Sequence, residues 1–370
     1  MVAANQNHAY LFLSLLQARV GSSLMRRIPG GETGSLLQRS APELAREIKL
    51  GEKPTRALAD LAEGFDAAAV LDRLRRKGFW AVTYADEAYP ARRRVVPDPP
   101  PALFVGGELG EGLSVAIVGS RRASRSGLET AEVLGRAVAA RGACVVSGLA
   151  AGVDAAAHEG ALAGGGSTVG VLGCGIHVVY PRGNRELFGR VREGGALVSE
   201  YVLGEAPLAW RFPARNRIIA GLSDAVVVEA PEKSGALITA CHAVDAGRDV
   251  WAVPGPRGAP ECRGSNRLLA DGAGVLWDVD EFLDAVCGPP KAPGPTRDKE
   301  VVPVLPDLPD GLPEREAEVL RGVDFRSAAA DVVAGRTGVE MRNVLSSLAM
   351  LELKGYVVRD AAGNLARRAP

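Results

Sequence analysis

Val115-Ala116-Ile117-Val118 followed by Gly119-Ser120-Arg121-Arg122 is an apolar run that ends at a glycine and a basic segment. An apolar run of this length that stops at a glycine is typical of a buried strand entering a loop. Six further runs of this kind follow along the chain: Cys144–Ser147, Thr168–Leu172, Ala196–Ser199, Ala225–Glu229, Val250–Val253 and Val275–Leu276. These runs predict the strands of one sheet.

The stretches between these runs are long enough for helices, as in Gly127–Arg141 and Leu237–Gly247. Continuous apolar strands are buried on both faces, which is typical of parallel sheets. Strands that alternate with helices predict a doubly wound α/β fold. We therefore expect a Rossmann-like parallel-sheet core over residues 113–287.

The segments around this core have different patterns. Residues 1–80 carry apolar residues at helical spacing with Gly and Pro breaks, which predicts a small helical domain. Residues 81–112 form an extended, proline-containing connector, with one short strand expected at Phe104-Val105. Residues 288–310 hold seven prolines and predict a semi-rigid linker.

Residues 311–370 predict three helices and a β-hairpin, the pattern of a winged helix. One helix carries an apolar stripe: Met341, Val344, Leu345, Leu348 and Leu351. Its expected outward residues are Arg342, Asn343, Ser346 and Ser347. Tyr356–Arg359 and the turn Ala362-Gly363-Asn364 predict the hairpin. Because the outward face is only mildly basic, protein contact and DNA reading both stay open for this domain.

The composition excludes several classes of protein. The chain has 44 basic and 44 acidic residues, so no global field draws it to nucleic acid or membrane. The basic residues are 37 Arg and 7 Lys; Arg suits phosphate, although codon bias also explains the excess. Five cysteines without CxxC spacing indicate reduced thiols and a cytoplasmic protein. The apolar run Ala9–Leu16 is too short for a membrane span and lacks the basic flank of a signal peptide.

The glycine loops at the strand ends do not form a known cofactor motif. A dinucleotide fingerprint needs glycines where the chain has Arg121 and Ser124, and the second strand ends at Ser147-Gly148 without a ribose-binding acid. Neither a GxxxxGK[ST] nor a GxSxG motif occurs in the sequence. We therefore expect no cofactor, no P-loop and no hydrolase elbow.

The same loops concentrate positive charge. Residues 115–285 hold 17 basic and 19 acidic residues, so the domain as a whole is not basic. The strand-end loops nevertheless collect Arg121, Arg122, Arg125, Arg211, Arg215, Arg217 and Lys233. In open α/β sheets ligands bind at the carboxyl ends of the strands, so these cations predict a cleft for a few phosphates of a single strand.

Phe212-Pro213-Ala214-Arg215-Asn216-Arg217-Ile218-Ile219 is the most informative of these segments. Its order is typical of a loop that enters the first turn of a helix, where free N–H groups and arginine forks bind anions. The ring of Phe212 offers a face on which a base can stack. Burial of this ring in the hydrophobic core is the equal alternative.

Three side chains have alternative chemical readings. Asp154 and His158 lie four residues apart on an expected helix, which favours a structural contact over half a metal site. Cys174 could be a nucleophile, although no oxyanion-binding device accompanies it. Glu229 could be a catalytic acid if the protein acts on nucleotides.

Nine short motifs at the strand ends follow one another along the chain in the order found in one protein family. They are Gly119-Ser120-Arg121, Ser147-Gly148-Leu149-Ala150, Gly152-Val153-Asp154, Gly173-Cys174-Gly175, Tyr180-Pro181, Phe212–Arg217, Ala220-Gly221-Leu222-Ser223, Ser234-Gly235 and Pro254-Gly255. In this order, over Val115–Leu276, they resemble the DNA-processing protein A family (DprA, also called Smf). The resemblance implies a helical N-terminal domain of the SAM or helix-hairpin-helix type, a Rossmann-like core and a winged helix. Ala18–Ser22 fits the helix-hairpin-helix pattern poorly.

The resemblance also implies a function. Such a protein binds single-stranded DNA without sequence specificity, helps to load the RecA recombinase in natural transformation and homologous recombination, and is not an enzyme. It would form a homodimer through the Rossmann-like core and have no membrane partner. The family's pocket corresponds here to Ser120, Arg121, Phe212, Arg215, Asn216, Lys233 and Ser234. The strand-end loops add further candidate DNA-binding residues: Gly119, Arg122, Gly148, Gly173, Gly175, Arg217, Gly235, Pro254 and Gly255.

Two other functions stay open at this point. One is a nucleotide-processing enzyme related to Rossmann-like phosphoribohydrolases, although their Pro-Gly-Gly-x-Gly-Thr loop is missing here. The other is a transcription regulator that senses a small ligand and reads DNA through the winged helix.

Overall fold

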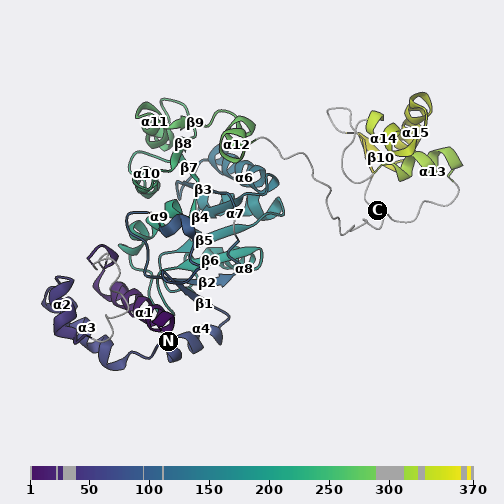
Figure 1. Cartoon of the computed structure of the whole chain (residues 1–370). Helices are drawn as coiled ribbons and strands as arrows, with labels where there is room; N and C mark the ends of the chain where they lie inside the picture. Colours follow the sequence, from purple (N-terminus) through teal and green to yellow (C-terminus); the bar gives the residue numbers. More distant parts are fainter. Residues whose placement is uncertain are drawn as a thin grey trace. The chain divides into compact units, whose positions relative to one another are not determined.

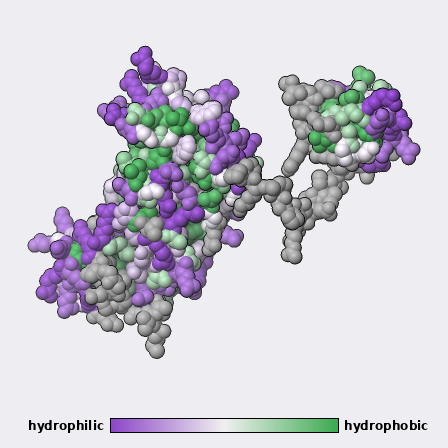
Figure 2. Space-filling model, turned by 45° about the horizontal axis from the view of Figure 1, so that its top comes forward, coloured by the Kyte–Doolittle hydropathy of each residue, from purple (hydrophilic) through white to green (hydrophobic). Residues whose placement is uncertain are grey.

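The computed structural model describes residues 2–21, 24–27, 39–94, 96–110, 112–288, 312–323, 330–359 and 365–367. The chain divides into two compact units, Met1–Ala292 and Pro293–Pro370. On the face shown in Figure 2, both hydrophilic and hydrophobic areas are visible on each unit. The predicted linker, apart from its first residue, lies outside the described residues.

The first unit is built on a nine-stranded sheet in the order β1-β2-β6-β5-β4-β3-β7-β8-β9 (Figure 1). Its strands are β1 Trp80–Thr83, β2 Ala102–Gly107, β3 Ser114–Gly119, β4 Cys144–Ser147, β5 Thr168–Leu172, β6 Gly195–Ser199, β7 Ala225–Glu229, β8 Asp249–Ala252 and β9 Gly274–Val275. The pairs from β6 to β9 are parallel. The predicted doubly wound sheet is therefore confirmed, with strand ends within one residue of those expected.

The order of the strands reverses beside β3. The chain runs outward through β4, β5 and β6, and then returns to place β7 on the other side of β3. Such a reversal leaves a crevice outside the carboxyl ends of the two strands, because their following loops diverge to opposite sides. This crevice is where the glycine loop after β3 and the loop after β7 meet.

Successive residues of the central strands face opposite sides of the sheet. Val115 and Ile117 pack with α6 (Arg125–Ala140), α7 (Val153–Ala163) and α12 (Val279–Cys287). Ala116 and Val118 pack on the other face, with α9 (Arg211–Leu222) and α10 (Gly235–Asp245). The remaining helices of the core are α8 (Arg185–Glu193) and α11 (Arg263–Ala270), with short 3-10 turns η3 (Arg182–Asn184) and η4 (Pro260–Cys262). Burial on both faces explains why these strands are apolar throughout.

The connector contributes more to the sheet than its sequence indicates. β1 and β2 pair antiparallel, and β2 continues antiparallel along β6. The sequence predicts only a short strand at Phe104-Val105 in this region. Trp80–Thr83 was not expected as a strand, because it is brief and directly follows a helical pattern. The hydrogen-bonding edge of β6 supplies the partner that extends β2 to Ala102–Gly107.

The N-terminal helices pack onto this antiparallel end of the sheet (Figure 1). They are α1 (Val2–Val20), η1 (Met25–Arg27), α2 (Ala41–Glu47), α3 (Glu52–Gly64) and α4 (Ala67–Arg75), and the connector adds α5 (Ala91–Arg94). Leu11 of α1 and Leu74 of α4 share a buried cluster with Phe104 and Leu197 of the sheet. No helix within the described ranges combines the length and the apolar character needed to cross a bilayer.

The second unit has the predicted helices α13 (Glu314–Arg321), α14 (Ala330–Thr337) and α15 (Met341–Leu353), followed by the antiparallel pair β10 (Val357–Arg359) and β11 (Leu365–Arg367). The turn at residues 362–364 lies outside the described residues. Two details of the α15 stripe are wrong. Met341 and Leu345 are 40% and 52% exposed, whereas Ser347 is buried. The buried face is narrower than expected and follows Val344, Leu348 and Leu351.

Candidate functional site

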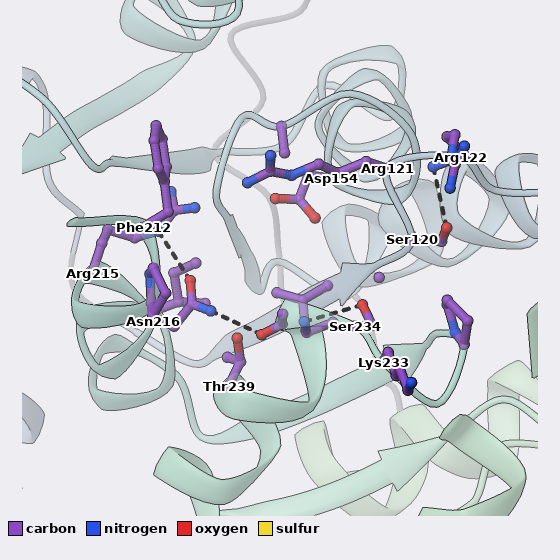
Figure 3. Close-up of a pocket in the computed structure, with 18 of the residues that line it drawn as sticks. Ser120, Arg121, Arg122, Asp154, Phe212, Arg215, Asn216, Lys233, Ser234 and Thr239 are labelled. Atoms are coloured by element: carbon purple, nitrogen blue, oxygen red, sulfur yellow. Dashed lines mark hydrogen bonds between the residues drawn. The ribbon is translucent and has the colours of Figure 1, made fainter. Parts of the chain in front are cut away.

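A cavity of about 560 Å³ opens at the carboxyl ends of β3 and β7. Its wall comes from the loop after β3, the start of α9, the loop after β7 and the first turn of α10 (Figure 3). Ten of the residues predicted from the sequence line it: Gly119, Ser120, Arg121, Arg122, Phe212, Arg215, Asn216, Lys233, Ser234 and Gly235. The crevice at the strand reversal therefore holds most of the predicted residues.

Helix α9 begins at Arg211, one residue before the segment that the sequence analysis singled out. The segment is thus helical throughout, and the expected loop at its start is wrong. Proline is tolerated in the first turn because its missing N–H has no intrahelical acceptor there. Phe212, Arg215 and Asn216 lie three and four residues apart and share the face that lines the cavity.

Arg215 lies at the floor of the cavity and is only 4% exposed. Its Nη1 donates to the carbonyl oxygens of Gly148, at 2.9 Å, and Val171, and its Nε donates to Oδ1 of Asn216 at 3.2 Å. Burial lowers the pKa of this guanidinium to about 10. Much of the hydrogen-bonding capacity that was expected to grip a phosphate is therefore used to hold the strand-end loops together.

Asp154 closes this floor from the start of α7. Its Oδ2 accepts the N–H of Gly148 at 3.1 Å. Burial raises the pKa of the Asp154 carboxyl, while Arg215 opposes the shift. A Cβ atom on Gly148 would lie 2.5 Å from Nη2 of Arg215, so only glycine allows this close approach.

The expected contact between Asp154 and His158 is not formed. The Nδ1 of His158 lies 2.7 Å from the hydroxyl of Thr168, which itself donates to the carbonyl of Val145. The hydroxyl of Thr168 therefore accepts a proton carried by Nδ1. Burial lowers the pKa of His158 to about 3, which favours the neutral imidazole. Among the described residues no group of three or more His, Cys, Asp and Glu side chains gathers as a metal site would require.

The rim of the cavity carries exposed cations. Arg121, Arg122 and Lys233 are exposed, and no carboxylate of a described residue lies within ion-pairing distance of any of them. Their charge therefore stays available to a ligand. The Arg121 guanidinium lies 5.6 Å from the centre of the Phe212 ring.

Phe212 is the centre of a small aromatic wall. The ring of Tyr180, which also lines the cavity, lies 5.2 Å from it at an interplanar angle of 34°. A Cβ atom on Gly173 would lie 2.8 Å from the Phe212 ring, so glycine makes room for it. Phe212 is half-buried, which leaves part of its ring accessible to a flat ligand.

The first turn of α10 forms the opposite wall. The Ser234 hydroxyl accepts the N–H of Ala236 at 3.2 Å and caps the helix. Asn216 donates from Nδ2 to the carbonyl of Gly235 at 3.0 Å and so ties α9 to α10. This contact fixes the width of the cavity between the two helices.

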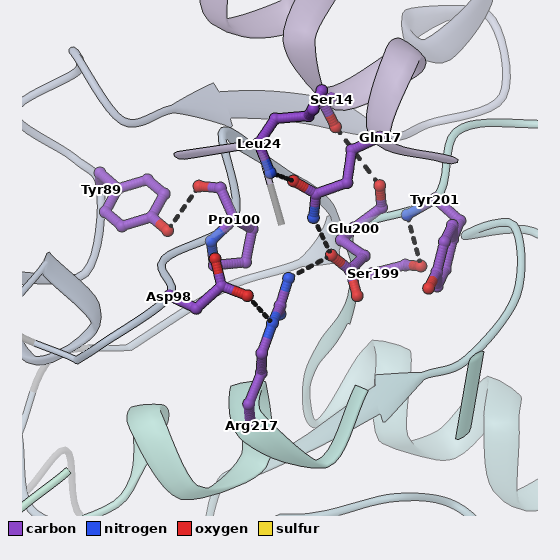
Figure 4. A network of polar contacts seen from close by, with 10 residues as sticks. All are labelled: Ser14, Gln17, Leu24, Tyr89, Asp98, Pro100, Ser199, Glu200, Tyr201 and Arg217. Carbon is purple, nitrogen blue, oxygen red and sulfur yellow. Dashed lines mark hydrogen bonds and ion pairs between the residues drawn. The ribbon is translucent and has the colours of Figure 1, made fainter. Parts of the chain in front are cut away.

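Arg217 lies outside the cavity, which contradicts its expected place in the site. It forms ion pairs with Asp98 at 3.0 Å and Glu200 at 2.6 Å (Figure 4). These carboxylates raise its pKa against the effect of burial. Two residues correspond to about 200° around a helix, so Arg217 faces away from Arg215.

The other predicted residues outside the lining are glycines and a proline. Gly148 and Gly173 lie behind the wall and support Arg215 and Phe212. The N–H of Gly175 donates to the carbonyl of Glu205, in the loop that precedes α9. Pro254 and Gly255 lie in the loop after β8. There the side chain of Asn266 accepts the N–H of Gly255 and donates to its carbonyl oxygen. Gly175, Pro254 and Gly255 themselves do not line the cavity.

The sequence analysis missed several lining residues: Asp154, Tyr180, Pro207, Ala209, Pro231 and Thr239. Tyr180 could have been found, because it is an aromatic residue shortly after the glycine loop of β5. Pro207 and Ala209 carry no such signal. Among the alternatives, burial raises the pKa of Cys174 to about 11, which makes a reactive thiolate unfavourable. Glu229 is not part of the lining.

Comparison with known proteins identifies the family. The family model described as DNA recombination-mediator protein A matches residues 80–287, and that of the DprA winged helix domain matches residues 303–363. Protein Smf of Synechocystis is 33% identical over 402 residues, covering 99% of this chain and 100% of the relative. Protein Smf of Escherichia coli is 38% identical and covers 76% of each chain.

Solved structures agree with this assignment. DNA processing protein A from Streptococcus pneumoniae has a TM-score of 0.65 and 30% identity, covering 75% of this chain and 98% of its own. DNA processing protein A from Helicobacter pylori, described by its single-stranded DNA binding mode, has a TM-score of 0.51 and 30% identity, covering 56% and 94%. The chain belongs to the DNA recombination-mediator protein A family.

Proposed function

We propose that this protein binds single-stranded DNA without sequence specificity in the cavity at the β3 and β7 ends. The observation that carries the proposal is the group of three unpaired cations, Arg121, Arg122 and Lys233, around the half-buried ring of Phe212. Cations of this kind bind phosphates, and an aromatic face stacks on any base. The single-stranded DNA binding of the Helicobacter pylori relative supports the same ligand.

The proposal is tested by fluorescence anisotropy with a labelled oligo-dT. We expect the double variant Arg121→Ala, Lys233→Ala to bind about 100-fold more weakly, from two lost phosphate contacts of about tenfold each. The salt dependence of log K should also become shallower by about 1.4, at about 0.7 per single-strand phosphate contact.

Arg125→Ala is the matched control. Arg125 lies in the same region but pairs with Glu129 and does not line the cavity. Its removal should leave the affinity unchanged. An Arg121, Lys233 double variant that binds as tightly as the Arg125 variant would place the DNA elsewhere. Equal affinity for dT, dA and dC oligomers is the expected sign of binding without sequence specificity.

We further propose that the bound strand is handed to the RecA recombinase in transformation and homologous recombination, in the cytoplasm and without catalysis by this chain. The family description as a recombination mediator supports this role. The measurement is RecA ATPase activity on single-stranded DNA already covered by a single-strand binding protein. We expect a shorter lag with the wild-type protein and no effect with the Arg121, Lys233 variant.

A homodimer through the Rossmann-like core is part of the same proposal. The β9 end of the sheet is an open edge, and Val275 and Trp277 beside it are 46% and 68% exposed. Light scattering should show twice the chain mass, and Val275→Asp with Trp277→Asp should reduce it to that of a monomer. A wild-type mass of one chain would reject the dimer.

The competing enzyme hypothesis has its own assay. A phosphoribohydrolase would release free base from nucleoside monophosphates, and we expect no release. A duplex that binds in preference to oligo-dT would instead favour the transcription-regulator hypothesis.

A further inference from the structure

A second, smaller pocket is lined in part by the loop between β6 and α9, which also contributes to the wall of the cavity. This junction groove, of about 340 Å³, is formed by α1, the α3–α4 turn, α4 and the loop between β6 and α9. Its lining is Leu15, Arg19, Leu61, Gly64, Phe65, Asp66, Ala69, Val70, Arg73, Val202, Leu203 and Glu205. The same loop contributes Pro207 and Ala209 to the cavity. One loop therefore contributes to the lining of both the cavity and the groove.

The junction groove holds two acidic and two basic side chains. Glu205 is paired with Arg211 at 2.7 Å, whereas Asp66, which accepts the N–H of Ala69, remains an exposed acidic side chain. Arg19 and Arg73 are exposed, and neither lies within ion-pairing distance of a carboxylate of a described residue. The groove therefore presents, among the described residues, two exposed cations against one exposed carboxylate, beside an apolar floor.

Trp210 lies on the loop that lines both the cavity and the groove and is 44% exposed. Its ring covers the end of α1, since a Cβ atom on Gly21 would lie 3.6 Å from it. Tyr201 contacts it edge to face at 6.4 Å, and the Arg211 guanidinium lies 5.2 Å from its centre. Because these contacts already hold the indole in place, its side chain loses little conformational entropy when a base stacks on its exposed part.

Several polar contacts hold this junction together. Ser14 of α1 donates to the backbone carbonyl of Glu200 at 3.3 Å, Gln17 donates to the Glu200 carboxylate at 3.0 Å, and Arg217 pairs with that carboxylate (Figure 4). Arg211 donates to the carbonyl of Ala18 at 3.1 Å. These contacts join the N-terminal helices to α9, so the groove keeps a fixed position relative to the cavity within the first unit.

We propose that the junction groove is a second binding site for single-stranded nucleic acid, which continues the strand from the cavity past Trp210 to Arg19 and Arg73. The inference rests on the proposed function of the cavity. It commits to a nucleic acid strand because unpaired cations, an apolar floor and an exposed indole suit phosphates and bases together. It also gives the N-terminal helical domain a direct part in binding.

The test compares two oligo-dT lengths on the full chain, about 6 and about 16 nucleotides, within the range that single-strand sites occupy. We expect the longer strand to bind wild-type protein more tightly. Arg19→Glu with Arg73→Glu should bind the short strand like wild type, but the long strand at least about tenfold more weakly. Arg56→Glu on α3 with Arg75→Glu on α4, both exposed cations outside the groove, should bind both strands like wild type.

The outcomes separate the groove from the cavity. An Arg19, Arg73 variant that keeps the full gain on lengthening would overturn the groove, as would a wild-type protein that gains nothing from length. The Arg121, Lys233 variant should lose both strands; if it loses neither, the cavity proposal fails instead.

Tryptophan fluorescence gives an independent readout. The long strand should quench the emission more than the short strand does, because a base stacks on Trp210. Trp210→Phe should remove this additional quenching, and Trp80→Phe, on the edge strand β1, should not. Additional quenching that survives in the Trp210→Phe variant would exclude contact with this indole.

Discussion

Arg121, Arg215 and Arg217 have the same side chain but three different roles. Arg121 is exposed at the rim and unpaired, Arg215 is buried on backbone carbonyls, and Arg217 is held between two carboxylates. Buried cations without partners are costly, so the two inner arginines must serve the fold before any ligand. We expect only the rim arginines to be removable without loss of stability.

Arg215→Ala should destabilise the protein by about 3 kcal/mol, because it leaves the buried carbonyls of Gly148 and Val171 without their donor and removes the positive charge beside the buried Asp154 carboxyl. Arg121→Ala, the control on the same cavity, should change stability by no more than about 0.5 kcal/mol. Urea denaturation followed by circular dichroism measures both. Equal stability of the two variants would show that the buried contacts of Arg215 contribute nothing.

His158 should make the stability of the protein depend on pH. The fold lowers its pKa to about 3 from 6.5, so between these values the unfolded chain binds more protons than the folded protein. Stability is therefore full above pH 6.5 and falls as the pH is lowered toward 3. From pH 7.5 to pH 5 the loss from this group is about 2 kcal/mol, at about 1.4 kcal/mol per pH unit below 6.5.

The measurement is the free energy of unfolding in urea at pH 7.5 and pH 5. His158→Asn keeps a donor near Thr168 but cannot gain a proton. Its loss of stability over this range should be smaller than that of wild type by the same amount. Identical losses would mean that the fold does not lower the pKa of this imidazole.

At the scale of elements, α6 and α7 pack with their backbones nearly touching. A Cβ atom on Gly135 of α6 would lie 2.3 Å from the carbonyl oxygen of Ala157 on α7. A Cβ atom on Gly160 of α7 would lie 2.0 Å from that of Glu132 on α6. Helical propensity alone counts these glycines as weak points, whereas the packing makes them necessary.

Gly135→Ala should therefore destabilise the protein by about 1–3 kcal/mol, as overpacking does. Gly189→Ala in α8 is the matched control, since no atom lies within 4 Å of its added Cβ. That change should instead stabilise by about 0.5–1 kcal/mol through helix propensity. Thermal unfolding of the two variants measures the difference, and a stabilised Gly135→Ala variant would contradict the close packing.

At the scale of the whole molecule, the two compact units are separate bodies in sequence. All residues of the cavity and of the junction groove belong to the first. A chain that ends at Ala292 should therefore fold and bind an oligo-dT of about 6 nucleotides as tightly as the full chain. Anisotropy on both chains measures this. Loss of short-strand affinity on truncation would show that the winged-helix unit takes part in this contact.

The sequence by itself determined the α/β core, its parallel strands and the winged helix, and it predicted the sheet edge at which the cavity lies. Parallel strands have their carboxyl ends at one edge, so loops such as Gly119–Arg122 and Lys233–Gly235 must gather there whatever else the chain does. Ten predicted residues meet in the cavity for this reason.

Only the tertiary structure decided which arginines face a ligand. The partner of Arg217 is Asp98, 119 positions away, and that of Arg215 is Gly148, 67 positions away. Periodicity within one helix separates its faces but does not say which face meets a carboxylate from another segment. The junction groove was likewise hidden, because it forms only where the N-terminal helices pack against the loop before α9.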